Sequence, residues 1–344
     1  MSDGSFSLVN VDGLSDVAVK LLDMIEKAVG WTVTPRGSKK DLEDALQYYK
    51  KAILDDETIP PIVKASKIAS AKKDLTQYIN QGRIITNTIS ELGNNANLKN
   101  VDLDWLSYFF DYAKNIQDET IQKIWARLLA EQCSGNTSIQ RNLIHILSLM
   151  DTETAIAFSN MCRLVIAVPI HSIAQSIETR YIPQFVPVIA PFMVYSIYLA
   201  LPDEYEEKQA MLSYKSCVPT PEQLAIFKEL GLITTLENRN AEFLYPYNFG
   251  LTQHRYESVD QDHKVQKLVE TTRKDYTIRY FDKEFCITPD HQKYEKDPEH
   301  IKLGLVQFTS IGVALYKAIK VNEVPGFLLF LTKYLELQGF NLTA

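Results

Sequence analysis

The sequence predicts a mainly α-helical protein, with an N-terminal helical bundle followed by a smaller α+β domain. Apolar residues recur at intervals of three and four through the first half of the chain, which is the spacing of an amphipathic helix. The segments between these stripes are short, so consecutive helices are expected to pack as antiparallel neighbours. Beyond about Leu201 the pattern changes, and aromatic and polar residues alternate in YTIRYFDKEF as they do in strands.

The first helix is expected between Leu14 and Trp31. Its apolar stripe includes Leu14, Leu21, Leu22 and Ile25, and its polar side carries balanced charges. A helix that lies on a membrane surface usually has an excess of Lys and Arg on that side. The stripe is therefore predicted to pack on the rest of the fold or on a second subunit, and it is our candidate self-association surface.

Two longer helices should follow. The first covers Ser38–Leu54, and the second begins after Pro60-Pro61 and covers Ile62–Leu92. Turn-forming residues at Gly93–Asn100 predict a loop.

Four shorter helices are predicted to complete the bundle. Asp102 or Asp104 can cap the helix that contains Trp105, and Asp118 can cap the helix that contains Trp125, because a carboxylate accepts hydrogen bonds from the free N–H groups of a first turn.

The last two of these helices have their own start signals. Thr137 and Gln140 have the spacing of a capping box, so the third helix is expected to begin at Thr137. The fourth is expected to begin at Asp151.

The C-terminal region mixes helices and strands. Helices are expected at Thr220–Leu230, Thr309–Lys320 and Phe327–Leu337. Between the first two of these, strands are expected from Gly231, at Phe243–Phe249, at Asp275–Thr288 and at Gly304–Phe308. The chain is thus divided into an N-terminal amphipathic helix and helical arm at 1–60, a helical bundle at 61–201 and an α+β domain at 202–344.

Composition limits the function classes. The formal net charge of −7 argues against a protein that mainly coats nucleic acid, since phosphate binding needs a basic surface. The four cysteines include no CxxC pair, which fits neither a zinc site nor a disulfide framework and indicates a reducing compartment. The N-terminus lacks the pattern of a secretory signal, so a cytoplasmic location is expected.

One segment tests that expectation. Tyr181–Leu201 is almost uncharged and long enough to span a bilayer. However, Pro183, Pro187 and Pro191 each remove a backbone donor and obstruct a helix. A buried strand or loop that leads into a core helix is favoured over a membrane span.

No catalytic motif stands out. The sequence has no GxxxxGK[ST], GxGxxG, GxSxG or HExxH pattern. A metal site in the polar segment His254–His300 is conceivable, but a charge-dense insert is normally a solvated surface. His145 and Cys162 are interpreted as structural residues. We therefore assign no catalytic residue, metal or cofactor, and lean towards a protein without enzymatic activity.

Two segments of the helical region carry a distinctive pattern, FFDYAKNIQDETIQKIWARLLAEQ and SIQRNLIHILSLMDTETAIAF, and Gly13–Pro35 carries a looser one. These segments resemble a bacterial family known as domain-of-unknown-function family 2806. The usual Gly and Pro after the Leu-Ala run are replaced by Glu131–Gly135. The matching residues are interpreted as core: Phe109, Phe110, Gln122, Trp125, Leu128 and Leu129.

The same Trp-Ala-x-Leu-Leu pattern is similar to abortive-infection proteins of the Abi-alpha type. This second resemblance implies a role in bacterial antiphage defence. Shared helix packing does not itself carry function.

Two C-terminal segments resemble the ends of a winged helix. LAIFKELGLI, Leu224–Ile233, ends a helix at a turn into the first wing strand, and VQFTSIGVALYKAI, Val306–Ile319, takes the second wing strand into a helix. The candidate recognition helix sets Lys228 against two glutamates, which is the wrong balance for following a phosphate backbone. Use of this domain for packing or protein contact is favoured.

These observations predict a cytoplasmic interaction or scaffold protein that binds a protein partner, such as a phage-derived one, and self-associates into a homo-oligomer. The first alternative is a nucleic-acid-binding regulator that uses Lys228, Arg239 and Arg255. The second alternative is a membrane-associated effector that uses Tyr181–Leu201.

Overall fold

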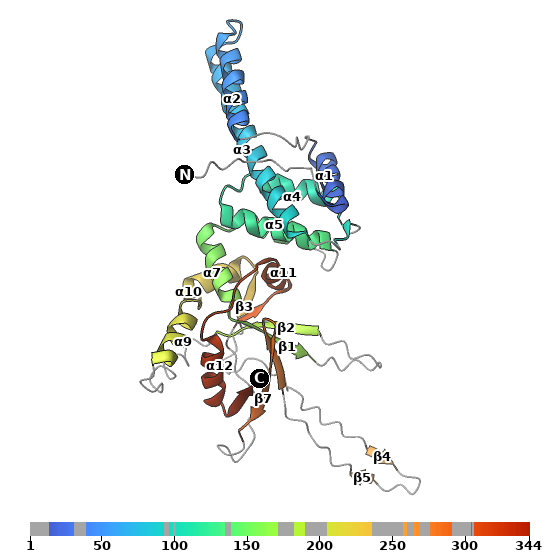
Figure 1. Cartoon of the computed structure of the whole chain (residues 1–344), viewed down its shortest axis with the longest axis vertical. Coiled ribbons are helices and arrows are strands. Elements are labelled where there is room, and N and C mark those ends of the chain that lie inside the picture. The colour runs from blue at the N-terminus through green and yellow to red at the C-terminus, as the bar shows by residue number, and fades with distance from the viewer. Residues whose placement is uncertain are drawn as a thin grey trace. The chain divides into compact units, whose positions relative to one another are not determined.

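The computed structural model describes residues 14–30, 39–92, 96–98, 101–134, 139–170, 182–189, 205–235, 257–259, 265–267, 276–290, 304 and 306–344. The protein is mainly helical with small antiparallel sheets, as predicted (Figure 1). The chain forms two compact units. Unit 1 consists of Met1–Ala155 and Ala314–Ile319, and unit 2 consists of Ile156–Val313 and Lys320–Ala344.

Unit 1 begins with helix α1, Asp16–Val29. The Ser15 hydroxyl accepts a hydrogen bond from Ala18 N, and the helix ends at Gly30 with φ +73°, a left-handed conformation that glycine adopts without steric cost. Its apolar stripe is buried, and α1 packs on α4, Leu103–Ala113.

Helices α2, Lys39–Asp55, and α3, Pro61–Glu91, form a helical hairpin (Figure 1). The hairpin divides into two parts along α3. From Asn80 onward α3 contributes buried residues to the core of unit 1, whereas none of the described side chains at 61–79 is buried. We call residues 43–79 the arm. Pro60-Pro61 starts α3 because proline at the first helical position loses no intrahelical bond.

The predicted caps of the next two helices are largely confirmed. Asp102, rather than Asp104, caps α4 by accepting a hydrogen bond from Trp105 N at 2.6 Å. Asp118 caps α5, Glu119–Ser134, through Ile121 N at 3.0 Å. Both helices place large aromatic residues in one core, where the Phe109 ring stacks on Trp105 and meets the edge of Trp125.

Helix α6, Arg141–Leu149, begins later than predicted. Its N-cap is Gln140, whose side chain makes no capping bond, and Thr137 lies outside the described residues. The chain before α6 is held by the buried Ile139, whose N–H donates to the Gln132 side chain at 2.7 Å. That bond to the preceding helix holds the segment before α6 in a non-helical conformation. Helix α7, Thr152–Cys162, starts after Asp151 as expected.

Unit 2 contains a five-stranded antiparallel sheet in the order β2-β1-β6-β7-β9. Its strands are β1, Val165–Ile170; β2, Ile182–Pro187; β6, Tyr276–Tyr280; β7, Lys283–Pro289; and β9, Phe340–Thr343. The favoured interpretation of Tyr181–Leu201 is supported where the structure describes that segment, since β2 pairs with β1 and Val188 and Ile189 are buried.

Helices α9, Tyr205–Lys215, and α12, Phe327–Glu336, pack together in the core of unit 2. The core is rich in aromatic rings, and Tyr214 stacks on Phe330 with centroids 3.7 Å apart. Tyr280 of β6 donates to Arg163 O and accepts from Val324 N. Burial raises the pKa of Tyr280 to about 12, so its hydroxyl stays protonated.

The two segments that resemble the ends of a winged helix are joined by a pair of short strands. Helix α10, Pro221–Glu229, leads into β3, Ile233–Thr235, which pairs with β8, Val306–Phe308; β8 then leads into α11, Ser310–Ala318. Between β3 and β8 the chain also forms the hairpin of β4, Glu257–Val259, and β5, Val265–Lys267. The predicted strand at Phe243–Phe249 lies outside the described residues.

In the described part of the chain, every helix is too short or too polar to cross a membrane.

Candidate docking cleft in unit 1

Four helices of unit 1 line a cleft of about 830 Å³ that is open to solvent. It lies where the arm joins the bundle, so its walls come from the end of α1, the middle of α2, the middle of α3 and the outer side of α4. Its apolar lining is formed by Ala28, Val29, Ala45, Leu46, Ala71, Leu75 and Phe110. The cleft is therefore an open groove with an apolar component to its walls.

The polar residues of the cleft are balanced in charge. Lys67 and Asp74 lie on α3, and Asp111 and Lys114 lie on α4. The Lys114 ammonium is 2.8 Å from the Asp111 carboxylate, which makes this pair an exposed ion pair of the rim. Tyr49 is 44% exposed and adds an aromatic ring with a polar tip to the α2 wall. The lining of the groove thus mixes apolar side chains with polar ones and with both signs of charge.

Buried amide side chains hold α3 against the end of α4. Asn80 donates to Lys114 O at 3.0 Å, and Gln81 donates to Phe110 O at 3.3 Å. Gln122 of α5 donates to Ile116 O at 2.8 Å, in the turn that follows α4. The last carbonyls of a helix lack a partner within it, and Asn80 supplies a donor to one of them, Lys114 O. Gln81 adds a second donor to Phe110 O, which already accepts from Lys114 N, and these bonds tie α3 to α4.

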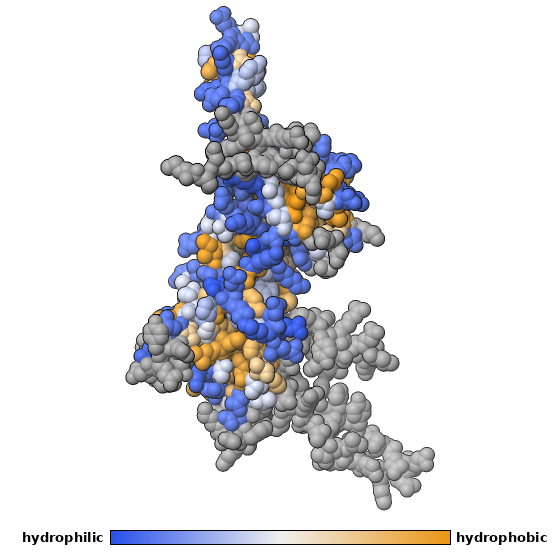
Figure 2. Space-filling view, viewed as in Figure 1, coloured by the Kyte–Doolittle hydropathy of each residue, from blue (hydrophilic) through white to orange (hydrophobic). Residues whose placement is uncertain are grey.

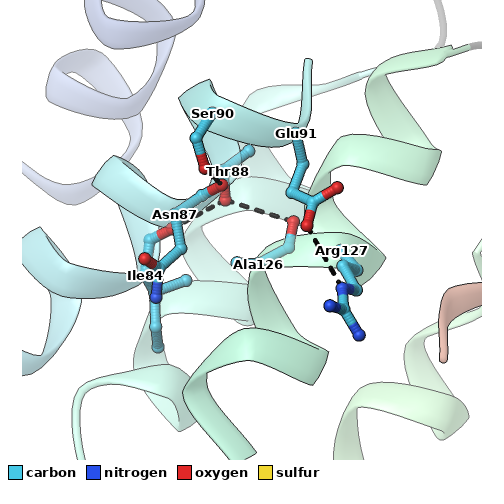
Figure 3. A network of polar contacts seen from close by, with 7 residues as sticks. All are labelled: Ile84, Asn87, Thr88, Ser90, Glu91, Ala126 and Arg127. Atoms are coloured by element: carbon cyan, nitrogen blue, oxygen red, sulfur yellow. Dashed lines mark hydrogen bonds and ion pairs between the residues drawn. The ribbon is translucent and has the colours of Figure 1, made fainter. Parts of the chain in front are cut away.

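A second polar network joins α3 to α5 (Figure 3). The Thr88 hydroxyl lies 2.8 Å from Ile84 O of its own helix and 3.2 Å from Ala126 O of α5. One turn further, the guanidinium Nε of Arg127 lies 3.3 Å from the Glu91 carboxylate, and both side chains are about a quarter exposed. This network anchors the C-terminal half of α3, whose other half carries the cleft and the arm.

The predicted self-association stripe of α1 lies inside unit 1. Leu21, Leu22 and Ile25 are buried there, and Leu14 is half-buried. The stripe therefore packs on the chain's own fold, which was one of its two predicted roles. Because Leu21 is buried in unit 1, a polar substitution there is expected to impair the folding of this unit, so it cannot report on self-association.

The six family-pattern residues lie in the core of unit 1. Phe109, Phe110, Trp125, Leu128 and Leu129 are fully buried, and Gln122 is almost so. Phe110 also reaches the cleft, which makes it the one member of this set that links core packing to a surface groove.

Most residues named for the alternative functions lie outside the described residues. Lys228 is exposed on α10, whereas Arg239, Arg255 and most of His254–His300 fall in the part of the chain that is not described. No group of three or more His, Cys, Asp or Glu residues able to hold a metal occurs among the residues that the structure describes. Burial raises the pKa of the Cys133 thiol to about 12 and that of Cys162 well above its ordinary value, so both thiols are unreactive core groups.

The fold and cleft define a helical protein with a surface groove and an attached α+β unit. Residues 67–180 match the model of a family described as "Protein of unknown function (DUF2806)". The match covers most of α3 and all of α4 to α7, and it supports the resemblance found in the sequence. No curated protein and no solved structure matches the chain.

Most cleft residues were not singled out from the sequence. Leu46, Ala71 and Leu75 look like ordinary members of helical stripes, and their common groove depends on where α2 leaves α3. One signal was available, because α3 is far longer than its neighbours in the bundle and must extend beyond them. Where a long helix leaves a bundle, a groove at the junction is expected.

Proposed function

We propose that this chain is a cytoplasmic interaction protein without enzymatic activity, and that the cleft binds an amphipathic helix of a protein partner. The observation that carries the proposal is the groove of about 830 Å³ formed by α1 to α4, whose lining combines apolar side chains with charges of both signs. A groove with such a lining can accept the apolar face of a helix, while its charges set orientation and suppress wrong partners.

The proposal is tested by a substitution that fills the groove with a larger side chain and removes no core contact. Ala71 lines the cleft, whereas Ala69 lies exposed on the same helix outside it. A photoreactive residue at Tyr49 first captures the partner in cells, and the partner is then purified. Ala71→Trp should weaken its binding by at least about tenfold, since a filled pocket excludes the partner's apolar anchor. Ala69→Trp makes the same change outside the groove and should bind normally.

Equal binding of both variants would show that the partner docks elsewhere. Circular dichroism and a denaturation curve for each variant ensure that lost binding is not lost folding.

The proposed setting is bacterial antiphage defence of the abortive-infection type, as the sequence resemblance implies. Its support is that resemblance alone. In a phage challenge, we expect phages to form fewer plaques on cells that express the unchanged chain than on cells that express Ala71→Trp. Cells that express Ala69→Trp should give the same plaque number as cells with the unchanged chain. Equal plaque numbers with and without the chain, across a panel of phages, would remove this setting while leaving partner binding open.

A second proposal is nucleic-acid binding through α10 by a domain that resembles a winged helix. It is favoured by the pairing of β3 with β8, which joins α10 and α11 as the resemblance implied. It predicts DNA affinity that falls steeply with salt and that drops further in Lys228→Glu. Affinity that is absent at low salt would exclude it.

A further inference from the structure

The arm ends in a tip where apolar and charged side chains are exposed together. Leu54 at the end of α2 is 50% exposed, and Ile62 and Val63 at the start of α3 are 78% and 40% exposed. Figure 2 shows apolar side chains among the hydrophilic ones that dominate the arm. These three residues are close in space because the five-residue connection 56–60 joins their helices. Large apolar side chains at such a tip have no partner in the core of unit 1.

The charges around this apolar surface are segregated along the arm. Asp55 and Glu57 lie at the tip itself, and Lys50 and Lys51 lie about one helical turn below it on α2. All four are exposed, and none has an ion-pair partner among the described residues. Asp56, by contrast, is engaged by the backbone and hydroxyl of Thr58, and Lys64 donates to Leu54 O. Asp55 and Glu57 therefore lie beyond the apolar surface, and Lys50 and Lys51 lie before it, as does the exposed Lys67 of α3.

We propose that the tip of the arm is a self-association surface whose occupant is the same surface of a second copy, placed antiparallel about a two-fold axis. A two-fold interface must be self-complementary, because each patch meets its own copy. When two tips overlap head to head, Asp55 and Glu57 of one copy meet Lys50 and Lys51 of the other. The second pair of contacts forms in the same way on the other side of the axis. Leu54, Ile62 and Val63 of both copies then lie near the axis and exclude water from each other.

The size of the overlap predicts a weak dimer. About two turns of each arm take part, which places the interface at the small end of specific contacts. Contacts at that end of the size range are weak and transient, so we expect a dissociation constant on the order of micromolar or higher. The proposal is independent of partner binding in the cleft, since no tip residue lines the cleft. The two proposals can therefore fail separately.

The first test measures the mass of the full chain by sedimentation over a concentration series that spans two orders of magnitude around that value. The mass should rise from 39.3 kDa towards twice that figure. Ile62→Lys places a charge near the axis and should weaken the dimer at least about tenfold. Leu149→Lys changes an exposed leucine on α6 in the same way and should leave dimerisation unchanged. A chain that stays at 39.3 kDa throughout, or a dimer that tolerates Ile62→Lys, overturns the proposal.

The second test exchanges the charges. Lys50→Glu/Lys51→Glu turns the contact with the acidic tip into repulsion, and Asp55→Lys/Glu57→Lys does the same with opposite sign. Each double variant alone should be monomeric, and an equimolar mixture should dimerise again, because both contacts then pair opposite charges. If the mixture stays monomeric while each variant retains its helical circular dichroism, the antiparallel tip-to-tip arrangement is wrong.

Discussion

The two buried tryptophans of unit 1 occupy similar places but differ in hydrogen bonding. Both rings pack against Phe109, yet only the Trp105 Nε1 has a partner, the carbonyl of Ile139 at 2.9 Å. The Trp125 Nε1 is buried without a partner in the described part of the chain. The sequence predicted Trp125 as a core residue and Trp105 only as part of a helix. It could not predict their difference in hydrogen bonding, because Ile139 reaches Trp105 from 34 residues further along the chain.

This difference predicts unequal costs for the same substitution. Trp105→Phe and Trp125→Phe remove the same ring atoms, so their packing losses are comparable. Trp105→Phe also leaves the Ile139 carbonyl without its donor, which adds about 1–2 kcal/mol, whereas Trp125→Phe removes an unsatisfied buried N–H. Denaturant unfolding should therefore show the larger loss for Trp105→Phe. The reverse order would mean that packing around Trp125 outweighs its missing hydrogen bond.

The N-cap of α7 should make stability depend on acid. The pKa of Asp151 lies below its ordinary value of 3.8, first because Thr154 N donates to its carboxylate. A lowered folded pKa means that the contribution of the carboxylate is fully present above the unfolded pKa. It is lost as pH falls through the folded pKa.

Asp151→Ala should therefore cost about 1 kcal/mol near neutral pH, which is the usual worth of such a cap, and the difference should shrink below about pH 4. Unfolding free energies of both proteins at several pH values provide the measurement. Asp151→Asn keeps a capping oxygen that does not titrate, so its advantage over Asp151→Ala should not change with pH. A wild-type advantage that grows in acid would contradict the lowered pKa of Asp151.

At the scale of elements, a close contact joins the two helix–strand segments of unit 2. The Thr309 hydroxyl donates to Gly231 O at 2.6 Å and caps α11 by accepting from Gly312 N at 3.1 Å. Gly312 faces the backbone of Leu232 so closely that a Cβ atom there would lie 2.0 Å from the Leu232 oxygen. Thr309 and Gly312 therefore hold the start of α11 in close contact with the turn that follows α10.

Gly312→Ala should destabilise unit 2 although alanine favours helices. The helix gains about 0.5–1 kcal/mol from alanine, but overpacking against a rigid carbonyl costs about 1–3 kcal/mol or more. A net loss is expected, and it should appear as a lower unfolding midpoint with faster amide exchange in β3 and α11. Ser310→Ala, on an exposed position of the same helix, serves as the control. A more stable Gly312→Ala protein would show that α11 moves away at little cost.

Local elements were predictable, whereas their partners were not. Three helix starts could be predicted from the aspartates that cap them, because a capping side chain accepts a hydrogen bond from an N–H only three residues away. These aspartates are Asp102, Asp118 and Asp151. The start of α6 was misplaced because the chain before it is held by the side chain of Gln132, on the preceding helix, rather than by a cap at Thr137. The hairpin of β6 and β7 could be expected from alternation within YTIRYFDKEF. Its pairing with β1 on one side and β9 on the other depends on contacts over long separations, which periodicity does not encode.

At the scale of the molecule, the candidate cleft and the arm tip both depend on one long helix. α3 runs for 31 residues, and its buried amides and Thr88 network secure only its second half. The sequence predicted this helix to within one residue at each end. It could not predict the groove or the exposed tip, because both depend on where α2 folds back and where α1 and α4 lie. The net charge of −7 is spread over the chain and says little about these local surfaces.

The position of β9 has a consequence for biosynthesis. The helices of unit 1 from α1 to α6 all lie within residues 16–149, so they can form while the ribosome is still translating the strands of unit 2. The sheet of unit 2 takes strands from residues 165–187, 276–289 and 340–343, and Phe340 belongs to its core. Since β9 is made well after the other four strands, β7 lacks its edge partner until that last strand has left the exit tunnel. A nascent chain thus carries an incomplete sheet through the synthesis of α11 and α12, and a premature stop before Phe340 would leave the sheet incomplete for good.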